Sequence, residues 1–181
     1  MSVAEGSIYG NTRPRIILNS NDEPVVVFGR NIDGTVHTAK FNGTDFDTPV
    51  QITPNNFQCY LANWTGPEID ASGDTIMIVF KENPLQEGHV YSVRSTNGGI
   101  NFTDPIRADS HPVGVAWLPN IAFDNNGNPS IIYMVHDQVW LNPRYVVSHS
   151  DDGGLTFNPE QEVTSIVPDE ACDCCPATIA K

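Results

Sequence analysis

Short apolar runs separated by tight polar turns are the main pattern along this chain, and they recur at a regular spacing. Three hairpins each open with Pro-x-Ile, turn at Asn, Asp or Gly, and continue in a more apolar run. Their opening prolines, Pro14, Pro67 and Pro119, lie 53 and 52 residues apart. No segment has the sustained 3.6-residue period of an amphipathic helix, so the pattern predicts an all-β protein.

Two further short apolar runs follow each hairpin, so each repeat predicts four antiparallel strands. A repeat of this length with four strands is typical of propeller blades. A two-sheet sandwich would explain the short strands but not the repeated opening. The predicted fold is therefore a β-propeller of four-stranded antiparallel blades, in a single partial domain over residues 1–181. Its blades cover about residues 12–54, 65–109 and 117–166, and the start of a fourth covers 175–181.

Three blades and the start of a fourth do not close a ring, because propellers close with about four to eight blades. Two explanations stay open. Either further blades belong to a longer protein, or a second copy of the chain supplies them. A homodimer of three-bladed halves would form a six-bladed ring with twofold symmetry, which is an allowed closure. We expect six blades in the complete propeller.

A second repeated feature lies between the third and outer strands, at residues 95–102 and 150–157. The second of these reads Ser-Asp-Asp-Gly-Gly-Leu-Thr-Phe, in which an Asp carboxylate can accept hydrogen bonds from turn amides. The pattern resembles the bacterial neuraminidase repeat, or Asp-box, of the sialidase superfamily. The resemblance implies a structural turn on the blade periphery, away from the ligand face. The implied turn residues are Ser95, Asn97, Gly99, Phe102, Ser150, Asp152, Gly154, Thr156 and Phe157.

The resemblance also implies that the ligand face forms where the loops entering the innermost strands converge. Trp64 and Trp117 precede their opening prolines by three and two residues. Tryptophan at such loops is suited to the apolar faces of sugars, and it is equally suited to filling the gap between blades. With these two residues, Asn120 and His111 are the predicted ligand-binding residues, and carbohydrate is the predicted partner.

Sialidase catalysis requires an arginine cluster for the substrate carboxylate, a tyrosine nucleophile and a carboxylic acid. The weak catalytic candidates in this chain are Arg13, Arg15 and Glu68. The family's first arginine lies in Phe/Tyr-Arg-Ile-Pro, whereas this chain has Arg13-Pro14-Arg15-Ile16 with the Pro and Ile reversed. A solvated or strand-pairing role for Arg15 and a solvated carboxylate at Glu68 are the alternatives. We expect this chain alone to lack sialidase activity.

Three of the four cysteines, Cys172, Cys174 and Cys175, lie within four residues, and Cys59 lies in a loop predicted to reach the same face. Three interpretations stay open. Cys59 forms a disulfide with one of the three, which suits an exported protein. Alternatively the cluster binds copper or zinc, with His111 as a further ligand. The third interpretation is thiols without a special role. No other cofactor is predicted.

The net charge of −13, from 22 acidic and nine basic residues, opposes binding to nucleic acid or to an anionic membrane. The chain begins without the basic and apolar regions of a signal peptide, and for the full-length protein we expect an extracellular or periplasmic location. Two functions remain open, a glycan-directed propeller or a non-catalytic scaffold for protein interaction or soft-metal binding. The remaining histidines are expected at surfaces or strand edges: His37, His89, His136 and His149.

Overall fold

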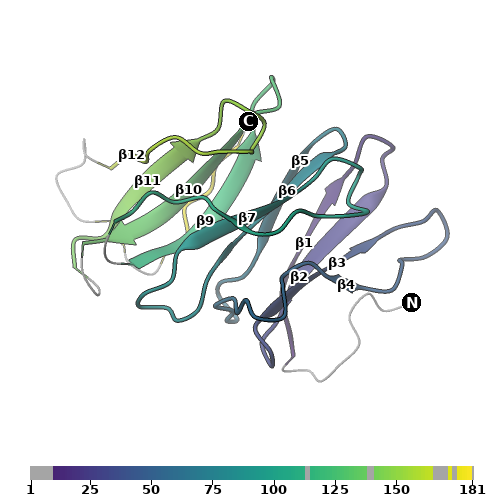
Figure 1. Ribbon diagram of the computed structural model, residues 1–181, viewed down its shortest axis with the longest axis horizontal. Helices are drawn as coiled ribbons and strands as arrows, with labels where there is room; N and C mark the ends of the chain where they lie inside the picture. The colour runs from purple at the N-terminus through teal and green to yellow at the C-terminus, as the bar shows by residue number, and fades with distance from the viewer. Residues whose placement is uncertain (1–9, 113–114, 138–140, 165–170, 173–174, 181) are drawn as a thin grey trace.

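The computed structural model describes residues 10–112, 115–137, 141–164, 171–172 and 175–180. These residues form twelve β-strands and no helix, which confirms the all-β prediction. The strands build three four-stranded antiparallel sheets. The sheets stand side by side in chain order, with the second between the other two (Figure 1). Within this described part, there is no helix that could span a membrane.

Each sheet contains four consecutive strands in chain order, and the outer strand has two residues. The first sheet contains β1 (Asn11–Leu18), β2 (Pro24–Arg30), β3 (Thr35–Lys40) and β4 (Val50–Gln51). The second contains β5 (Glu68–Ser72), β6 (Thr75–Lys81), β7 (Val90–Ser95) and β8 (Ile106–Arg107). The third contains β9 (Val115–Phe123), β10 (Pro129–His136), β11 (Arg144–His149) and β12 (Gln161–Glu162).

The core lies between the sheets, and the β6 sequence explains why. Ile76, Ile78 and Phe80 pack in a cluster with β2 of the first sheet. The alternate residues Met77 and Val79 pack in another cluster with β9 and β10 of the third sheet. Because successive side chains of a strand point to opposite faces, a strand covered on both faces must be apolar at nearly every position. This accounts for the continuous apolar run in β6.

The first strand of a sheet is irregular where its opening proline lies. The register of β1 shifts between Thr12 and Arg15, and Arg13 has a φ of 50°. Leu118, just before the opening proline of β9, has a φ of 51° beside another register shift. The same local conformation therefore recurs in the first and third sheets. It makes the residues that follow the prolines equivalent in position: Arg15, Glu68 and Asn120.

Hydrogen bonds within the turn at residues 150–157 hold it closed. Asp152 accepts bonds from the Leu155 and Thr156 amides at 3.0 and 2.9 Å, and from the Thr156 hydroxyl at 2.7 Å. The bonds from Thr156 are the main reason that the pKa of Asp152 is lowered to about 2. The Gly154 amide donates to the Ser150 hydroxyl at 2.8 Å. Phe157 packs against the core between the second and third sheets, so it ties the turn to the fold.

The turn at residues 95–102 has a related but weaker set of bonds. Asn97 accepts from the Asn101 amide at 3.0 Å and from the Ser95 hydroxyl at 2.9 Å. The Gly99 amide donates to the Ser95 hydroxyl at 3.0 Å. Phe102 packs against the core between the first and second sheets. An amide oxygen at Asn97 thus replaces a carboxylate, with the same geometry but without its charge.

Two expectations about histidine placement are wrong, because His37 and His136 are buried. The ring of His37 stacks on Phe28 at a centroid distance of 5.7 Å. The Nε2 of His136 accepts a hydrogen bond from Trp117 Nε1 at 3.2 Å. Each imidazole has an aromatic neighbour, which allows it to lie within the packed interior.

Candidate functional site

The three weak catalytic candidates meet in one ion-paired cluster between β1 and β5. Arg15 binds the Glu68 carboxylate with both Nε and Nη2, at 2.6 and 2.7 Å. Arg13 Nη2 donates to the same carboxylate at 3.2 Å. Glu68 is buried, so the expectation of a solvated carboxylate is wrong. Two arginines compensate the charge that burial would otherwise disfavour.

The close approach of β1 and the loop before β5 depends on Gly66. A Cβ at this position would lie 2.7 Å from the Arg13 Cβ, which is too close for any side chain. The equivalent position in the first sheet is Arg13 and in the third is Leu118. The missing side chain at Gly66 therefore makes room for Arg13 beside Glu68.

An aromatic cluster lies next along this face. Trp64 is 46% exposed, and its ring contacts Tyr60 at 5.8 Å and Trp117 at 5.5 Å between centroids. Trp117 is 5% exposed and packs among Val115, Leu118 and Met134. The two tryptophans thus differ in environment. Trp117 fills the interior, while Trp64 presents part of its indole to solvent.

A hollow of about 300 Å³ lies beside Tyr60 on the same end of the sheets. Polar side chains from the loops after β2 and β6 and from the loop before β5 surround it, together with Tyr60 and Leu61. Tyr60 gives the hollow one aromatic ring, and the polar groups around it can form hydrogen bonds with a ligand. The polar lining residues are Asn31, Asp33, Gln58 and Asn83.

His111 and Asn120, the other predicted ligand residues, make structural contacts. Asn120 Oδ1 accepts a hydrogen bond from the Ile179 amide at 3.3 Å, which links β9 to the C-terminal segment. His111 is buried, with Nδ1 2.8 Å from Glu160 Oε1 and Nε2 3.1 Å from the His136 carbonyl oxygen. Burial alone would lower the pKa of His111, but the bonds to Glu160 and to the His136 carbonyl raise it overall. Both ring nitrogens face acceptors, which favours the imidazolium.

Sequence reasoning missed a tyrosine–carboxylate pair, Tyr133 and Glu160. The Tyr133 hydroxyl donates to Glu160 Oε2 at 2.8 Å and lies 2.9 Å from the Ser148 hydroxyl. Tyr133 is completely buried, and burial raises the pKa of its phenol. A nucleophile needs a lowered pKa and access to substrate. The pair is therefore part of the packing between the second and third sheets.

Among the cysteines that the structure describes, none is linked to Cys59, as one of the three interpretations required. Cys59 is buried and is not joined to Cys172 or Cys175, and burial raises the pKa of its thiol. Cys174 lies outside the described residues. Among the residues that are described, no three His, Cys, Asp or Glu side chains are grouped to hold a metal. The copper or zinc site includes Cys174 and stays a prediction.

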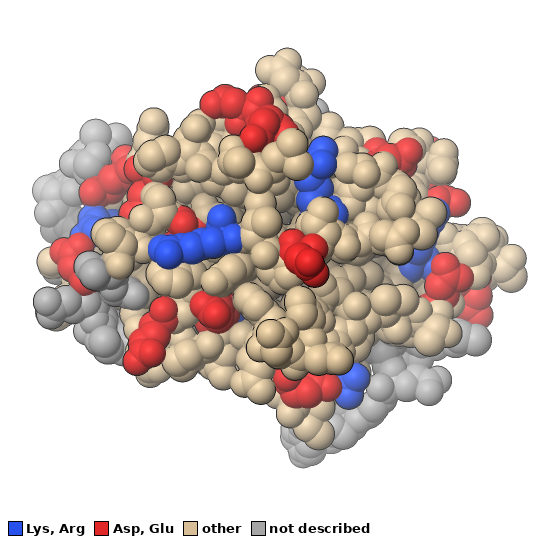
Figure 2. Space-filling model, viewed as in Figure 1, with Lys and Arg blue, Asp and Glu red and all other residues tan. Residues whose placement is uncertain are grey.

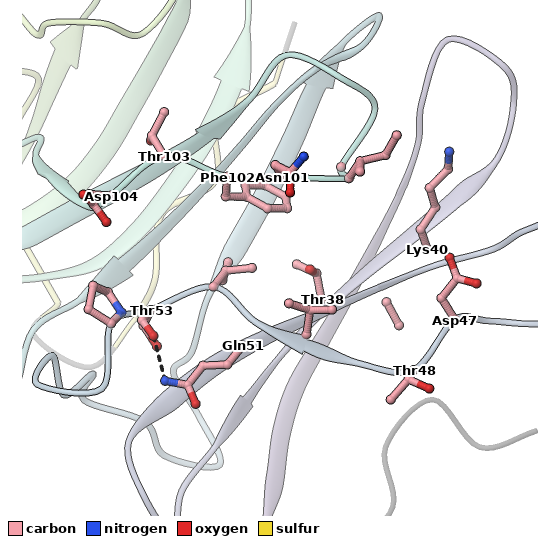
Figure 3. Close-up of a pocket in the computed structure, with 16 residues that line it drawn as sticks. Thr38, Lys40, Asp47, Thr48, Gln51, Thr53, Asn101, Phe102, Thr103 and Asp104 are labelled. Carbon is pink, nitrogen blue, oxygen red and sulfur yellow. Dashed lines mark hydrogen bonds between the residues drawn. The ribbon is translucent and has the colours of Figure 1, made fainter.

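A second groove lies on the outer side, between the first and second sheets. It encloses about 440 Å³. Figure 3 shows Thr38, Lys40 and Gln51 on one side and Asn101 to Asp104 on the other. Many of its side chains already have partners within the fold, such as Lys40 Nζ with Glu23 at 2.8 Å. The groove borders the turn at residues 95–102, and neither Trp64 nor Glu68 lines it.

Acidic side chains are spread over the face drawn in Figure 2, as the net charge of −13 requires. On the described part of this face, Lys and Arg form no continuous patch (Figure 2). Arg13 and Arg15 share one carboxylate, Glu68, which compensates one of their two charges. The positive charge near the candidate site is therefore limited to a small area and does not form a continuous basic patch.

No model of a known protein family and no curated protein matches this sequence. Solved structures do match. A protein of unknown function from Dyadobacter fermentans aligns with a TM-score of 0.62 and 18% identity over 86% of this chain. A Hadza microbial sialidase aligns with a TM-score of 0.64 and 9% identity over 84%. An endo-arabinase from Bacteroides thetaiotaomicron aligns with a TM-score of 0.54 and 15% identity over 90%.

The fold is therefore that of propeller-type glycoside hydrolases. The alignments extend over only part of these proteins: 55% of the Dyadobacter protein, 37% of the sialidase and 66% of the endo-arabinase. At these identities the likeness concerns the fold alone. The chemistry of the site has to be argued from the residues of this chain.

Proposed function

We propose that this chain is part of a glycan-binding β-propeller of the sialidase superfamily. Sugar binds at the end of the sheets where Tyr60 borders the 300 Å³ hollow and the Trp64 ring contacts Tyr60. The exposed Trp64 indole, supported from behind by Trp117, is the observation that carries the proposal. An exposed, rigidly backed ring offers a flat apolar surface for a sugar, and the neighbouring amide side chains offer hydrogen bonds.

The described residues support binding more than complete catalysis. Glycoside hydrolysis needs two carboxyl groups about 5–9.5 Å apart on either side of the scissile bond. At this end of the sheets two arginines engage Glu68, and Asp33 beside the hollow pairs with Arg30. Both oxygens of Glu68 already accept hydrogen bonds from guanidinium groups. Its role is to position Arg13 and Arg15 beside the binding face, and hydrolysis requires groups beyond these.

The turns at residues 95–102 and 150–157 are Asp-boxes in this proposal, with a structural role. Their support is the bonding at Asp152 and Asn97 together with the anchoring phenylalanines. They lie at the opposite end of the third strands from Trp64. No ligand contact is assigned to them.

A further blade packs against the first sheet, in a ring of six. Ile16 and Leu18 of β1 are 60% and 55% exposed, whereas the equivalent Ile121 and Phe123 of β9 are buried against the preceding sheet. Two neighbouring large apolar side chains on a sheet face favour burial by another sheet. The blade comes from the same polypeptide or from a second copy, and the mass in solution distinguishes these. An extracellular or periplasmic location completes the proposal.

The test is a titration of intrinsic tryptophan fluorescence with sialyllactose, arabino-oligosaccharides and β-1,3-galacto-oligosaccharides. Trp64→Ala is expected to weaken binding of the preferred sugar at least about tenfold, a loss of about 1.4 kcal/mol. Leu155→Ala is the matched control, because Leu155 is an exposed apolar residue in the turn at residues 150–157. Equal binding by the Trp64 variant and the parent protein would refute the proposed site.

A further inference from the structure

Cys172 and Cys175 bring two exposed thiols together at the C-terminal end of the chain. Their sulfur atoms lie 3.1 Å apart. The Cys175 amide donates to the Cys172 carbonyl oxygen at 3.4 Å. Both side chains are exposed. A small-molecule oxidant can therefore reach either sulfur, in contrast to the buried Cys59 thiol.

The third sheet contacts the chain at both cysteines and at the residue before Cys172. The Tyr145 hydroxyl donates to the carbonyl oxygen of Cys175 and lies 3.4 Å from that of Cys172. The amide of Ala171 donates to the Pro143 carbonyl oxygen at 3.2 Å. Ala171 also packs against the apolar cluster that contains Trp117. These contacts fix the backbone at each cysteine, so joining the two sulfurs needs a movement of only about 1 Å.

We propose that Cys172 and Cys175 form a redox site, a dithiol that low-molecular-weight disulfides oxidise to an intramolecular disulfide. One thiolate attacks the small disulfide, forms a mixed disulfide and releases one small thiol. The second thiolate attacks the protein sulfur of this mixed disulfide and releases the second small thiol. The two cysteines lose two electrons and two protons, and the small disulfide gains both.

The disulfide constrains the C-terminal segment, which runs beside β9. Just beyond Cys175, the Ile179 amide bonds to Asn120 Oδ1 at 3.3 Å, on the strand that also carries Trp117. Closing the four-residue loop removes conformations from the unfolded segment. Oxidation therefore stabilises the segment against the third sheet. The proposal does not depend on glycan binding, and its test uses no sugar.

The test oxidises the whole chain at stepped ratios of reduced to oxidised glutathione. Each sample is quenched with N-ethylmaleimide, its free thiols are counted, and the bridged peptides are mapped by mass spectrometry. The expected result is the loss of two of the four thiols with a Cys172–Cys175 bridge, reversed by dithiothreitol. Cys174→Ser is the matched control and should oxidise at a glutathione ratio within about threefold of the parent.

Cys172→Ser and Cys175→Ser are expected to require a ratio at least about tenfold more oxidising to form any intramolecular bridge. Oxidation should also slow proteolysis after residue 164 in Cys174→Ser, but not in Cys172→Ser. Three outcomes would overturn the proposal: a bridge that contains Cys174 or Cys59, four thiols that persist in oxidised glutathione, or thiols that react only after a chelator removes copper or zinc.

Discussion

Glu68 is the residue whose loss should most clearly reveal how the first two sheets are joined. Its carboxylate accepts two hydrogen bonds from Arg15 and one from Arg13. The Glu68 side chain is 11% exposed, whereas those of Arg15 and Arg13 are 35% and 25% exposed. Glu68→Ala leaves both guanidinium groups without their common partner. Arg15→Ala leaves Glu68 with Arg13, and the lost guanidinium was already partly solvated.

Breaking a fully buried ion pair costs about 3–5 kcal/mol, and an exposed pair contributes about 0–1 kcal/mol. The intermediate exposure of the arginines reduces the first figure, so Glu68→Ala should cost about 3 kcal/mol and Arg15→Ala about 1–2 kcal/mol. For a chain of this size, about 3 kcal/mol corresponds to a decrease in Tm of about 6–12 °C. The two variants should not be additive, because they remove the same contact.

Thermal and urea unfolding followed by circular dichroism measure these differences. Glu87→Gln is the control, since Glu87 is an exposed carboxylate in the loop before β7. In the double-mutant cycle, the coupling energy between Arg15 and Glu68 should exceed about 1 kcal/mol. A Glu68→Ala variant as stable as Glu87→Gln, or one less affected than Arg15→Ala, would refute the reasoning.

Three further predictions concern the other sites. Trp117→Ala should destabilise the fold by about 3–5 kcal/mol because it empties a buried site, whereas Trp64→Ala should change urea stability by less than about 1 kcal/mol; similar losses in both would contradict their assigned environments. Asp152→Asn should lower stability at neutral pH. Because the pKa of Asp152 is lowered from 3.8 to about 2, its contribution is present above pH 3.8 and is lost as pH falls towards 2. When stability is measured against falling pH, Asp152→Asn should therefore lack the loss that Asp152 causes in the parent protein between pH 3.8 and about 2. The raised pKa of His111 implies the opposite dependence of stability on pH. The stabilisation from its pair with Glu160 is full below pH 6.5 and is lost as pH rises through the folded-state pKa of His111. His111→Gln should remove this decline, while His149→Gln should keep it; an unchanged profile in the His111 variant would count against the pair.

The sequence by itself determined the strands and their grouping into sheets. Alternation between short apolar runs and Asn, Asp or Gly turns is a local property, and β7 (Val90–Ser95) is one of the strands that the pattern predicts after each hairpin. The turn at residues 150–157 was equally readable, because its bonds join residues within a few positions of one another. Such features follow from backbone geometry and need no distant partner.

Tertiary structure alone decided which side chains meet and which are buried. Trp64 and Trp117 occupy similar sequence positions, but the neighbours of Trp117 in the third sheet bury it and leave Trp64 partly exposed. Glu68 becomes a buried ion pair only because β1 brings two arginines to it from more than 50 residues away. Exposure and charge pairing depend on the packing of one sheet against the next, which no local pattern encodes.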